Sequence, residues 1–262
     1  MLIPFIKMHA QGNDFVILNG LEQELPELSY PDLARHLCPR RISVGADGLV
    51  LLLPDSDADA RMIIYNSDGS RAEMCGSALR CVASLAADHF VRDFLDIVTD
   101  SGTKNARIEP ETGVITVNLG SARMLNSEYP VDAFQGDLID IGNPHYVIWT
   151  DDLSQDPHLQ YGPGLEHHSA FSNPVNVHFA RKINEHEIQM KIWEHACGAT
   201  LACGTGAAST VFSGIHRALL AHDVTVNVPG GVIRISYLES SDELLLSGTV
   251  AKVFEGQFTW KA

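Results

Sequence analysis

Short runs of valine, isoleucine, leucine and phenylalanine recur along the chain and are separated by glycine-containing turns. Runs of this kind have the length of a β-strand, so the pattern predicts a protein rich in strands. Between them, sequences such as Ser67-Asp68-Gly69 and Pro229-Gly230-Gly231 are typical of turns, because glycine accepts the backbone conformations that tight turns require. The clearest apolar runs are residues 15–18, 49–53, 62–65, 114–119 and 146–149.

Two longer segments follow a helical period instead. Residues 78–92 and 206–222 are rich in alanine and leucine, with apolar positions three or four apart, and we predict a helix for each. Each helix follows a Cys-Gly pair, Cys75-Gly76 or Cys203-Gly204. The repeated order indicates an α+β chain of two similar halves; the alternative is that Cys-Gly recurs by chance in a chain with 21 glycines. Strand-like runs follow the two helices at 95–99 and 224–228.

The amino-acid composition and net charge limit which kinds of protein and which partners are plausible. The 262 residues are 45% hydrophobic and 19% charged, as in ordinary globular domains, so a folded core is expected. Acidic residues outnumber basic ones 33 to 18, and the formal net charge of -15 disfavours nucleic acid and anionic membranes as partners. No run approaches the roughly 18 apolar residues of a membrane span, and the first residues do not resemble an export signal. We therefore expect a cytoplasmic protein.

The cysteine content disfavours disulfides and zinc. Five cysteines, an odd number, in a chain without an export signal are not typical of a disulfide framework. No Cys/His spacing matches a zinc site, so we predict no bound metal. Cys38 and Cys81 are expected to lie in the core, because unpaired cysteines are often small buried hydrophobes. The same structural role is the preferred interpretation for Cys197, in the loop before Cys203.

Cys75 and Cys203 have a different expected environment, because each stands at the start of a predicted helix. A thiol there lies near the positive end of the helix dipole and near unsatisfied N–H groups, so its thiolate is favoured and can act as a base. A pair of such thiols facing one carbon atom from opposite sides would invert its configuration. The N–H groups that could hold a substrate carboxylate belong to Gly76, Ser77, Gly204 and Thr205.

Eight short motifs occur in order between residues 7 and 206. They are Lys7-Met8-His9, Gly12-Asn13-Asp14-Phe15, Gly45-Ala46-Asp47-Gly48, Asn66-Ser67-Asp68-Gly69-Ser70, Glu73-Met74-Cys75-Gly76, Gly142-Asn143-Pro144-His145, Val175-Asn176-Val177 and Leu201-Ala202-Cys203-Gly204-Thr205-Gly206. In this order and number they resemble the motifs of the diaminopimelate epimerase family. The resemblance implies two pseudo-symmetric halves, each a β-rich barrel-like sheet around a central helix, with the active site in the cleft between them. It assigns residues 1–119 and a returning C-terminal strand, 249–262, to one half, and 120–248 to the other.

The resemblance also implies an isomerase that needs no cofactor. Cys75 and Cys203 would exchange protons with the Cα atom of an amino acid, in the conversion of LL-diaminopimelate to meso-diaminopimelate that serves lysine and peptidoglycan biosynthesis. His145 and Glu194 would assist the two thiols, and Asn13 would lie near the reacting carboxylate. The asparagines also occur in turn-forming sequences, which is their alternative role. Those that would hold the distal end of the substrate are Asn66, Asn143 and Asn176.

The loop before Cys203 departs from the family pattern. Where the family has an arginine that pairs with the distal carboxylate, this chain has His195, and Ala199 replaces a glutamate. An imidazole cannot form the two-pronged contact of a guanidinium. The substrate is therefore either diaminopimelate, held by the asparagines and His195, which we prefer, or an amino acid without the distal carboxylate, such as histidine.

A protein of the same fold that has lost two-base chemistry is the alternative from another functional class. It is disfavoured because both Cys75 and Cys203 are retained. The expected partner is a small amino acid, and a homodimer is one assembly that the sequence leaves open.

Overall fold

The computed structural model describes residues 1–260, which divide into two compact units. Unit 1 comprises Met1–Val117 and the C-terminal segment from Gly248 onward, and unit 2 comprises Asn118–Ser247. Within the described residues, no helix has the length and apolar character needed to cross a membrane.

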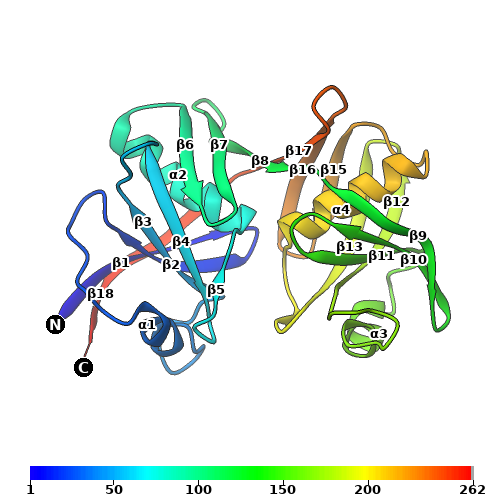
Figure 1. Cartoon of the computed structure of the whole chain (residues 1–262), viewed down its shortest axis with the longest axis horizontal. Helices are drawn as coiled ribbons and strands as arrows, with labels where there is room; N and C mark the ends of the chain where they lie inside the picture. Colours follow the sequence, from blue (N-terminus) through cyan, green and yellow to red (C-terminus); the bar gives the residue numbers. More distant parts are fainter. Residues whose placement is uncertain (261–262) are drawn as a thin grey trace. The chain divides into compact units, whose positions relative to one another are not determined.

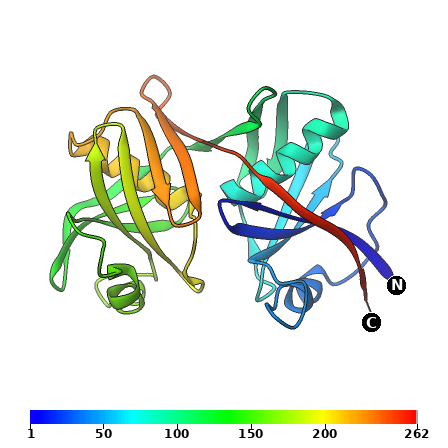
Figure 2. The same ribbon diagram turned by 180° about the vertical axis from the view of Figure 1, so that it is seen from behind.

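Unit 1 is a set of strands around one buried helix, α2 (Gly76–Phe90), which packs against β1, β2, β4, β6 and β7 (Figure 1). The last strand pairs antiparallel with the first, and the two lie side by side in Figure 2. In chain order the other elements are β1 (Leu2–Ala10), β2 (Asn13–Asn19), α1 (Tyr30–Leu37), β3 (Gly48–Leu53), β4 (Ala60–Asn66), β5 (Arg71–Ala72), β6 (Phe94–Thr99), β7 (Gly102–Glu109), β8 (Val114–Gly120) and β18 (Ala251–Thr259).

Unit 2 has the same plan around α4 (Gly204–His216), which packs against β10, β11, β12 and β16 (Figure 1). The chain passes from one unit to the other within β8. The remaining elements are β9 (Arg123–Val131), β10 (Phe134–Asp140), β11 (Pro144–Trp149), α3 (Pro157–Glu166), β12 (Asn176–Asn184), β13 (Glu187–Glu194), β14 (Gly198–Ala199), β15 (Asp223–Val228), β16 (Gly231–Leu238) and β17 (Glu243–Gly248).

The strand pairings of the two units repeat step by step. In unit 1, β2 and β3 are parallel and joined through α1, and β4 is antiparallel to β3 and parallel to β6. In unit 2, β11 and β12 are parallel and joined through α3, and β13 is antiparallel to β12 and parallel to β15. In both units a two-residue strand, β5 or β14, precedes the central helix. The predicted α+β fold of two similar halves is confirmed.

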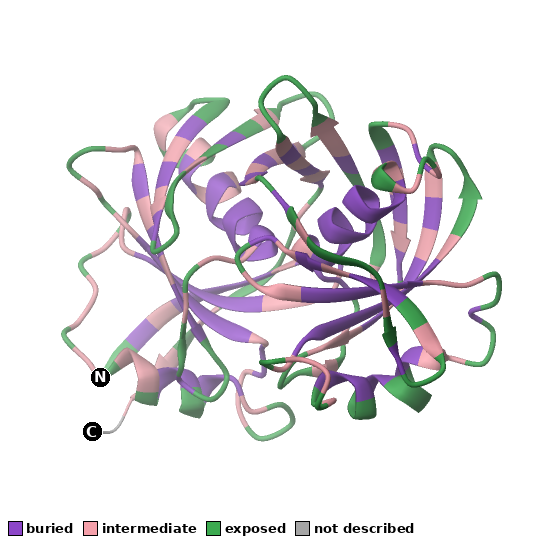
Figure 3. Ribbon diagram, turned by 45° about the vertical axis from the view of Figure 1, so that its right-hand side comes forward, coloured by how far each residue is buried: buried purple, intermediate pink, exposed green. Residues whose placement is uncertain are grey.

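Both central helices are buried on almost every side, as their colouring in Figure 3 shows. Their composition explains this, because a helix that is apolar or small-residued all round belongs in a core. All seven predicted strand runs lie within strands of the structure. The second helix is shorter than predicted: it ends at His216 rather than residue 222, because Ala218 adopts a left-handed backbone with a φ of 54°.

Candidate functional site

Cys75 is the residue that caps the N-terminus of α2 in unit 1. Its extended backbone, with φ -145° and ψ 119°, places it just outside the helix, so the N–H groups of Gly76 and Ser77 belong to the first turn and lack helical partners. The side-chain amide of Asn13, at the start of β2, donates to Cys75 Sγ over 3.8 Å. Asn13 therefore contacts the thiol of Cys75 within unit 1, and its expected place near the reacting carboxylate of the substrate is a proposal.

Asn66 lies at the exposed end of β4 and is engaged in the turn that follows. Its side chain donates to Ser70 Oγ over 2.9 Å, and its backbone N–H donates to the Ser70 carbonyl over 2.8 Å. The turn-forming role of this asparagine is thus present in the structure, and a role in substrate binding is a proposal.

Cys203 caps α4 in the same way but in a more buried setting, with 4% of its surface exposed. The Gly206 N–H donates to Sγ over 3.4 Å, and Thr205 Oγ1 lies 3.6 Å from it. Burial raises the pKa of Cys203 well above its usual value, and the negative charge of Glu194 raises it further. The prediction that both helix N-termini favour a thiolate is therefore wrong for Cys203, which rests as a thiol and is suited to donate a proton.

Glu194 ends β13, where it pairs with Gly198 of β14. Thr200 Oγ1 donates a hydrogen bond to its carboxylate, and the carboxylate in turn acts on the thiol of Cys203. The structure thus brings Glu194 and Cys203 together within unit 2, although eight residues separate them in sequence.

His145, the second residue of β11, is fully buried and stacked on His178 of β12, with ring centroids 5.0 Å apart. Nε2 of His145 lies 2.9 Å from Asn143 Oδ1, and Nδ1 lies 2.8 Å from Nε2 of His178. Because Asn143 Oδ1 can only accept, the proton of His145 is on Nε2 and that of His178 points at His145. Burial lowers the pKa of His145 well below its usual value and that of His178 to about 3, so both rings are neutral near pH 7.

His178 was not predicted as a functional residue, because it lies in β12 between Val177 and Phe179, which belong to the core. One ligand atom each of His145, His178 and Cys203 lies within 4.8 Å of the others, a grouping that sequence spacing does not reveal. These are ligand types of zinc sites. However, both nitrogens of His145 are already hydrogen-bonded to protein groups. Asn143, His145 and His178 therefore form a hydrogen-bonded chain, and Cys203 lies close to the two histidines.

Asn176 connects two segments of unit 2 by hydrogen bonds. Its Nδ2 donates to the Pro144 carbonyl over 3.0 Å, and its Oδ1 accepts from the His195 N–H over 3.1 Å. In the parallel pairing of β11 and β12, Asn176 is the partner of His145. This asparagine therefore holds the segment of His145 beside that of His195, and a direct grip on the substrate is a proposal.

Glu166, at the end of α3, organises the loop that carries His195. Its buried carboxylate accepts from Trp193 Nε1 over 2.7 Å, from the Ala196 N–H over 2.9 Å, and bonds His195 Nδ1 over 2.8 Å. Burial alone would raise the pKa of Glu166, but these hydrogen bonds outweigh it and lower the pKa, so the group is a carboxylate. The side chain of His195, directed by this contact, is about half-exposed. No sequence motif pointed to Glu166, which is 29 residues from His195.

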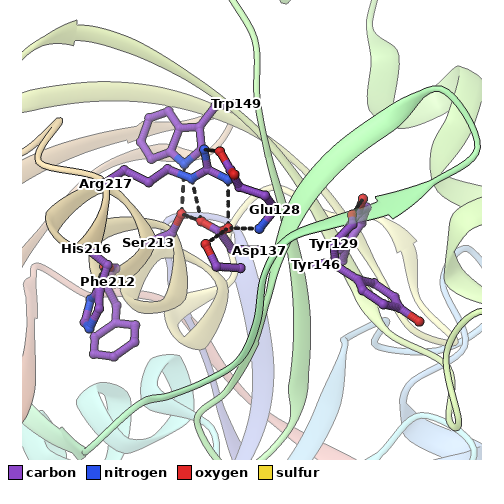
Figure 4. A network of polar contacts seen from close by, with 10 residues as sticks. Glu128, Tyr129, Asp137, Tyr146, Trp149, Phe212, Ser213, His216 and Arg217 are labelled. Atoms are coloured by element: carbon purple, nitrogen blue, oxygen red, sulfur yellow. Dashed lines mark hydrogen bonds and ion pairs between the residues drawn. The ribbon is translucent and has the colours of Figure 1, made fainter.

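A polar network anchors the other end of α4 (Figure 4). Asp137 of β10 accepts hydrogen bonds from Ser213 and, through both oxygens, from the Arg217 guanidinium. Trp149 of β11 donates to Ser213 Oγ over 2.8 Å. The network connects α4 to two strands and so fixes the helix whose N-terminus is capped by Cys203.

The remaining cysteines separate into core and surface. Cys38 and Cys81 are buried, as predicted, and burial raises the pKa of each to about 12, so both are unreactive thiols. Cys197 is exposed, and the expectation that it is a structural core residue is wrong. The loop that carries it turns sharply, with left-handed backbone at Ala196 and Gly198, which directs residue 197 outward.

Comparisons with known proteins identify the family to which this chain is similar. The sequence model of the family described as "Diaminopimelate epimerase" matches residues 5–125 and 138–253. Proteins named diaminopimelate epimerase from Desulforudis audaxviator and Halothermothrix orenii are 38% and 37% identical to this chain; each alignment covers 98% of this chain, and 99% and 98% of those proteins.

A solved structure has the same fold at much lower identity. It is a hydroxyproline epimerase from Agrobacterium vitis with bound trans-4-hydroxy-L-proline, with a TM-score of 0.74 at 15% identity, covering 98% of this chain and 92% of that one. Since the family model spans most of the sequence and close relatives match it from end to end, the chain belongs to the diaminopimelate epimerase family, whose members are isomerases.

Proposed function

We propose that this protein interconverts LL- and meso-diaminopimelate by inverting one Cα atom, with Cys75 and Cys203 as proton-transfer groups and no cofactor. The observation that carries the proposal is that each unit has one cysteine capping its buried central helix. The names of the relatives supply the substrate. A reducing cytoplasm is the expected setting, because both thiols must stay reduced.

In the proposed reaction the Cys75 thiolate removes the proton from Cα, and the electron pair of the broken C–H bond remains on the carbon. Helix N–H groups stabilise the charge that moves onto the adjacent carboxylate. The Cys203 thiol then donates its proton to the opposite face, so the configuration inverts. The enzyme is left with a thiol at Cys75 and a thiolate at Cys203.

Return to the starting state requires one proton to leave Cys75 and one to reach Cys203. Glu194, whose carboxylate acts on the Cys203 thiol, is the proposed group for exchange at that end. His145 is neutral and buried close to Cys203, so we propose that it assists the same exchange. Both roles follow from the position of these groups beside a reacting sulfur atom.

We propose that the distal end of the substrate is held by His195, with Asn143 and Asn176 supporting the loops around it. Glu166 bonds Nδ1 of His195, which leaves Nε2 as the nitrogen directed to a ligand. An imidazole fixed in this way can make one contact with the distal carboxylate, in place of the two-pronged contact of a guanidinium.

Glu166→Gln should raise KM for diaminopimelate about tenfold and leave kcat nearly unchanged. A hydrogen bond to a charged group contributes about 1.5 to 3 kcal/mol, and about 1.4 kcal/mol corresponds to a tenfold change in affinity. Steady-state kinetics give both constants. The matched control is His167→Ala, because exposed His167 also contacts Glu166, over 3.2 Å, but does not position the loop. A loss of kcat at unchanged KM, or equal effects of the two variants, would contradict this role.

The test of the proposed function is the conversion of LL-diaminopimelate to the meso form by the purified protein in buffer with EDTA and a reductant. We expect the two isomers to reach equilibrium without added metal or pyridoxal phosphate. Lysine, glutamate and histidine, assayed under the same conditions, should be inert. Inversion of one of these in place of diaminopimelate would identify a sister racemase, and restoration of activity by a metal after EDTA would exclude the cofactor-free reaction.

A further inference from the structure

Arg80, in the second turn of α2, is a buried cation without an anionic partner. It is 1% exposed, and among residues 1–260 no carboxylate lies within ion-pair distance of it. Its guanidinium donates from Nη1 to Gln11 Oε1 over 2.9 Å and from Nε to the Gly76 carbonyl over 3.4 Å, both of which are neutral groups. Buried charges in proteins are nearly always paired, so the missing counter-charge calls for an explanation.

The guanidinium is directed back toward the start of α2, as helical side chains generally are. Its contact with the Gly76 carbonyl places it beside the residue that directly follows Cys75. Two groups would act on it when negatively charged, Cys81 and Cys75. Because burial raises the pKa of Cys81 to about 12, that thiol is neutral, whereas Arg80 itself, with a pKa lowered by burial to about 10, stays charged near pH 7. Of the two groups, Cys75 is therefore the one that can supply a counter-charge to Arg80.

A second connection joins Arg80 to the environment of Cys75. Gln11, which accepts the Arg80 hydrogen bond, lies in the turn between β1 and β2 and has a left-handed backbone with a φ of 49°. Its Nε2 donates to the Thr249 carbonyl over 3.0 Å, which fixes the turn. Two residues later β2 begins with Asn13, the amide that donates to Cys75 Sγ. Gly248 makes room for this arrangement, because a Cβ there would lie 2.3 Å from Nη1 of Arg80.

We propose that Arg80 is a positioning residue for the reaction: its buried guanidinium stabilises the thiolate of Cys75, so that this cysteine enters catalysis as the base. The inference rests on the proposed function, in which Cys75 exchanges a proton with Cα. Cys203 has the opposite electrostatic setting, since burial and Glu194 hold it as a thiol. The two cysteines would therefore begin the reaction in different protonation states that the protein itself imposes.

The other ionisable groups on the elements that pack with α2 are bonded elsewhere or lie away from the core. Lys7 pairs with Asp14, Arg61 with Asp55, and Asp96 bonds Asn105. His9 Nδ1 accepts the Gly12 N–H over 3.2 Å. Tyr65 of β4 lies in a core cluster with Leu49 and Leu51, and its side chain interacts with Arg71. The outer groups that complete the set are Lys104, Arg107 and Glu109 on β7 and Asp88 and His89 at the end of α2.

The test is the pH dependence of alkylation by iodoacetamide at each cysteine, measured by mass spectrometry on wild type, Arg80→Met and Arg80→Lys. Removing an opposite charge at close range shifts a pKa by about one unit or more. In Arg80→Met we expect the midpoint for Cys75 to rise by at least about one pH unit, with about tenfold slower alkylation below it. Arg80→Lys, which keeps the charge, should recover most of that shift. In the wild type, the acid limb of the pH profile of kcat/KM should have the same midpoint as the alkylation of Cys75.

Cys203 and Cys197 are internal controls, and their profiles should be the same in all three proteins. A merely structural role would alter their alkylation together with that of Cys75 and would lower the thermal unfolding temperature. Should Arg80→Met fail to fold, Arg80→Gln removes the charge and keeps a hydrogen-bond donor. An unchanged Cys75 midpoint in the uncharged variant would overturn the proposal. Because alkylation needs no substrate, failure of the protein to act on diaminopimelate would count against the proposed function alone.

Discussion

Replacing Cys75 or Cys203 by alanine should reduce kcat by about a thousandfold or more and leave the fold intact. Each thiol carries one of the two proton transfers, and general acid or base catalysis typically contributes about 10²- to 10⁴-fold. Without the Cys75 thiolate nothing removes the proton from Cα, and without the Cys203 thiol nothing protonates the opposite face. The rate of inversion measured by chiral chromatography, together with far-UV circular dichroism, tests both parts of the expectation.

Cys197→Ala is the matched control, because Cys197 lies six residues before Cys203 but is exposed at the surface. Its activity should stay within about twofold of the wild type, as expected for a surface substitution away from the reacting groups. Near-full inversion by either of the two catalytic variants would disprove the assignment of two bases.

Asp137→Asn should destabilise the protein by about 3 kcal/mol. The carboxylate of Asp137 is fully buried and accepts hydrogen bonds from Arg217, Ser213 and the Glu128 N–H (Figure 4). Neutralising one member of a buried ion pair typically costs about 3 to 5 kcal/mol, because the partner charge is left uncompensated. Arg217 is partly exposed, so the lower end applies. Urea unfolding of both proteins at pH 7 gives the difference.

The stability lost in Asp137→Asn should be largest near neutral pH and should decrease as the pH falls. Burial opposes ionisation of Asp137, but the hydrogen bonds from Arg217 and Ser213 outweigh it and hold the pKa below its usual value. The stabilisation is therefore complete above the unfolded pKa of about 4 and disappears as the pH falls through the lower folded value. Glu128→Gln is the control, because exposed Glu128 contacts the same arginine over 3.5 Å and should cost less than about 1 kcal/mol. Equal losses from the two substitutions would contradict the importance of the buried pair.

Much of the fold could be predicted from the sequence because its signals are local. The apolar runs are strands, and each Cys-Gly pair precedes a helix, which alanine and leucine at helical spacing were sufficient to indicate. The C-terminal end of α4 could not be predicted from local sequence signals. It depends on the left-handed backbone at Ala218 and on the ion pair of Arg217 with Asp137, 80 residues away.

The residues of the site could be predicted only where they belong to a recognisable sequence motif. His178 and Glu166 have no local signal: one is 33 residues from His145 and the other 29 residues from His195, and both contacts are made by tertiary packing. The protonation state of Cys203 could not be predicted from the sequence either. The helix dipole favours a thiolate, but burial and a nearby carboxylate act the other way and prevail, and neither is visible in sequence order.

The most direct measurement of the central claim is the isotope content of both isomers when LL-diaminopimelate is converted in deuterium oxide and sampled at low conversion. If one thiol removes the proton and the other delivers a new one, the meso product carries deuterium at the inverted Cα, whereas the remaining LL substrate keeps hydrogen. Product that retains hydrogen at this carbon, or substrate that gains deuterium as fast as product forms, would contradict two-base inversion by Cys75 and Cys203.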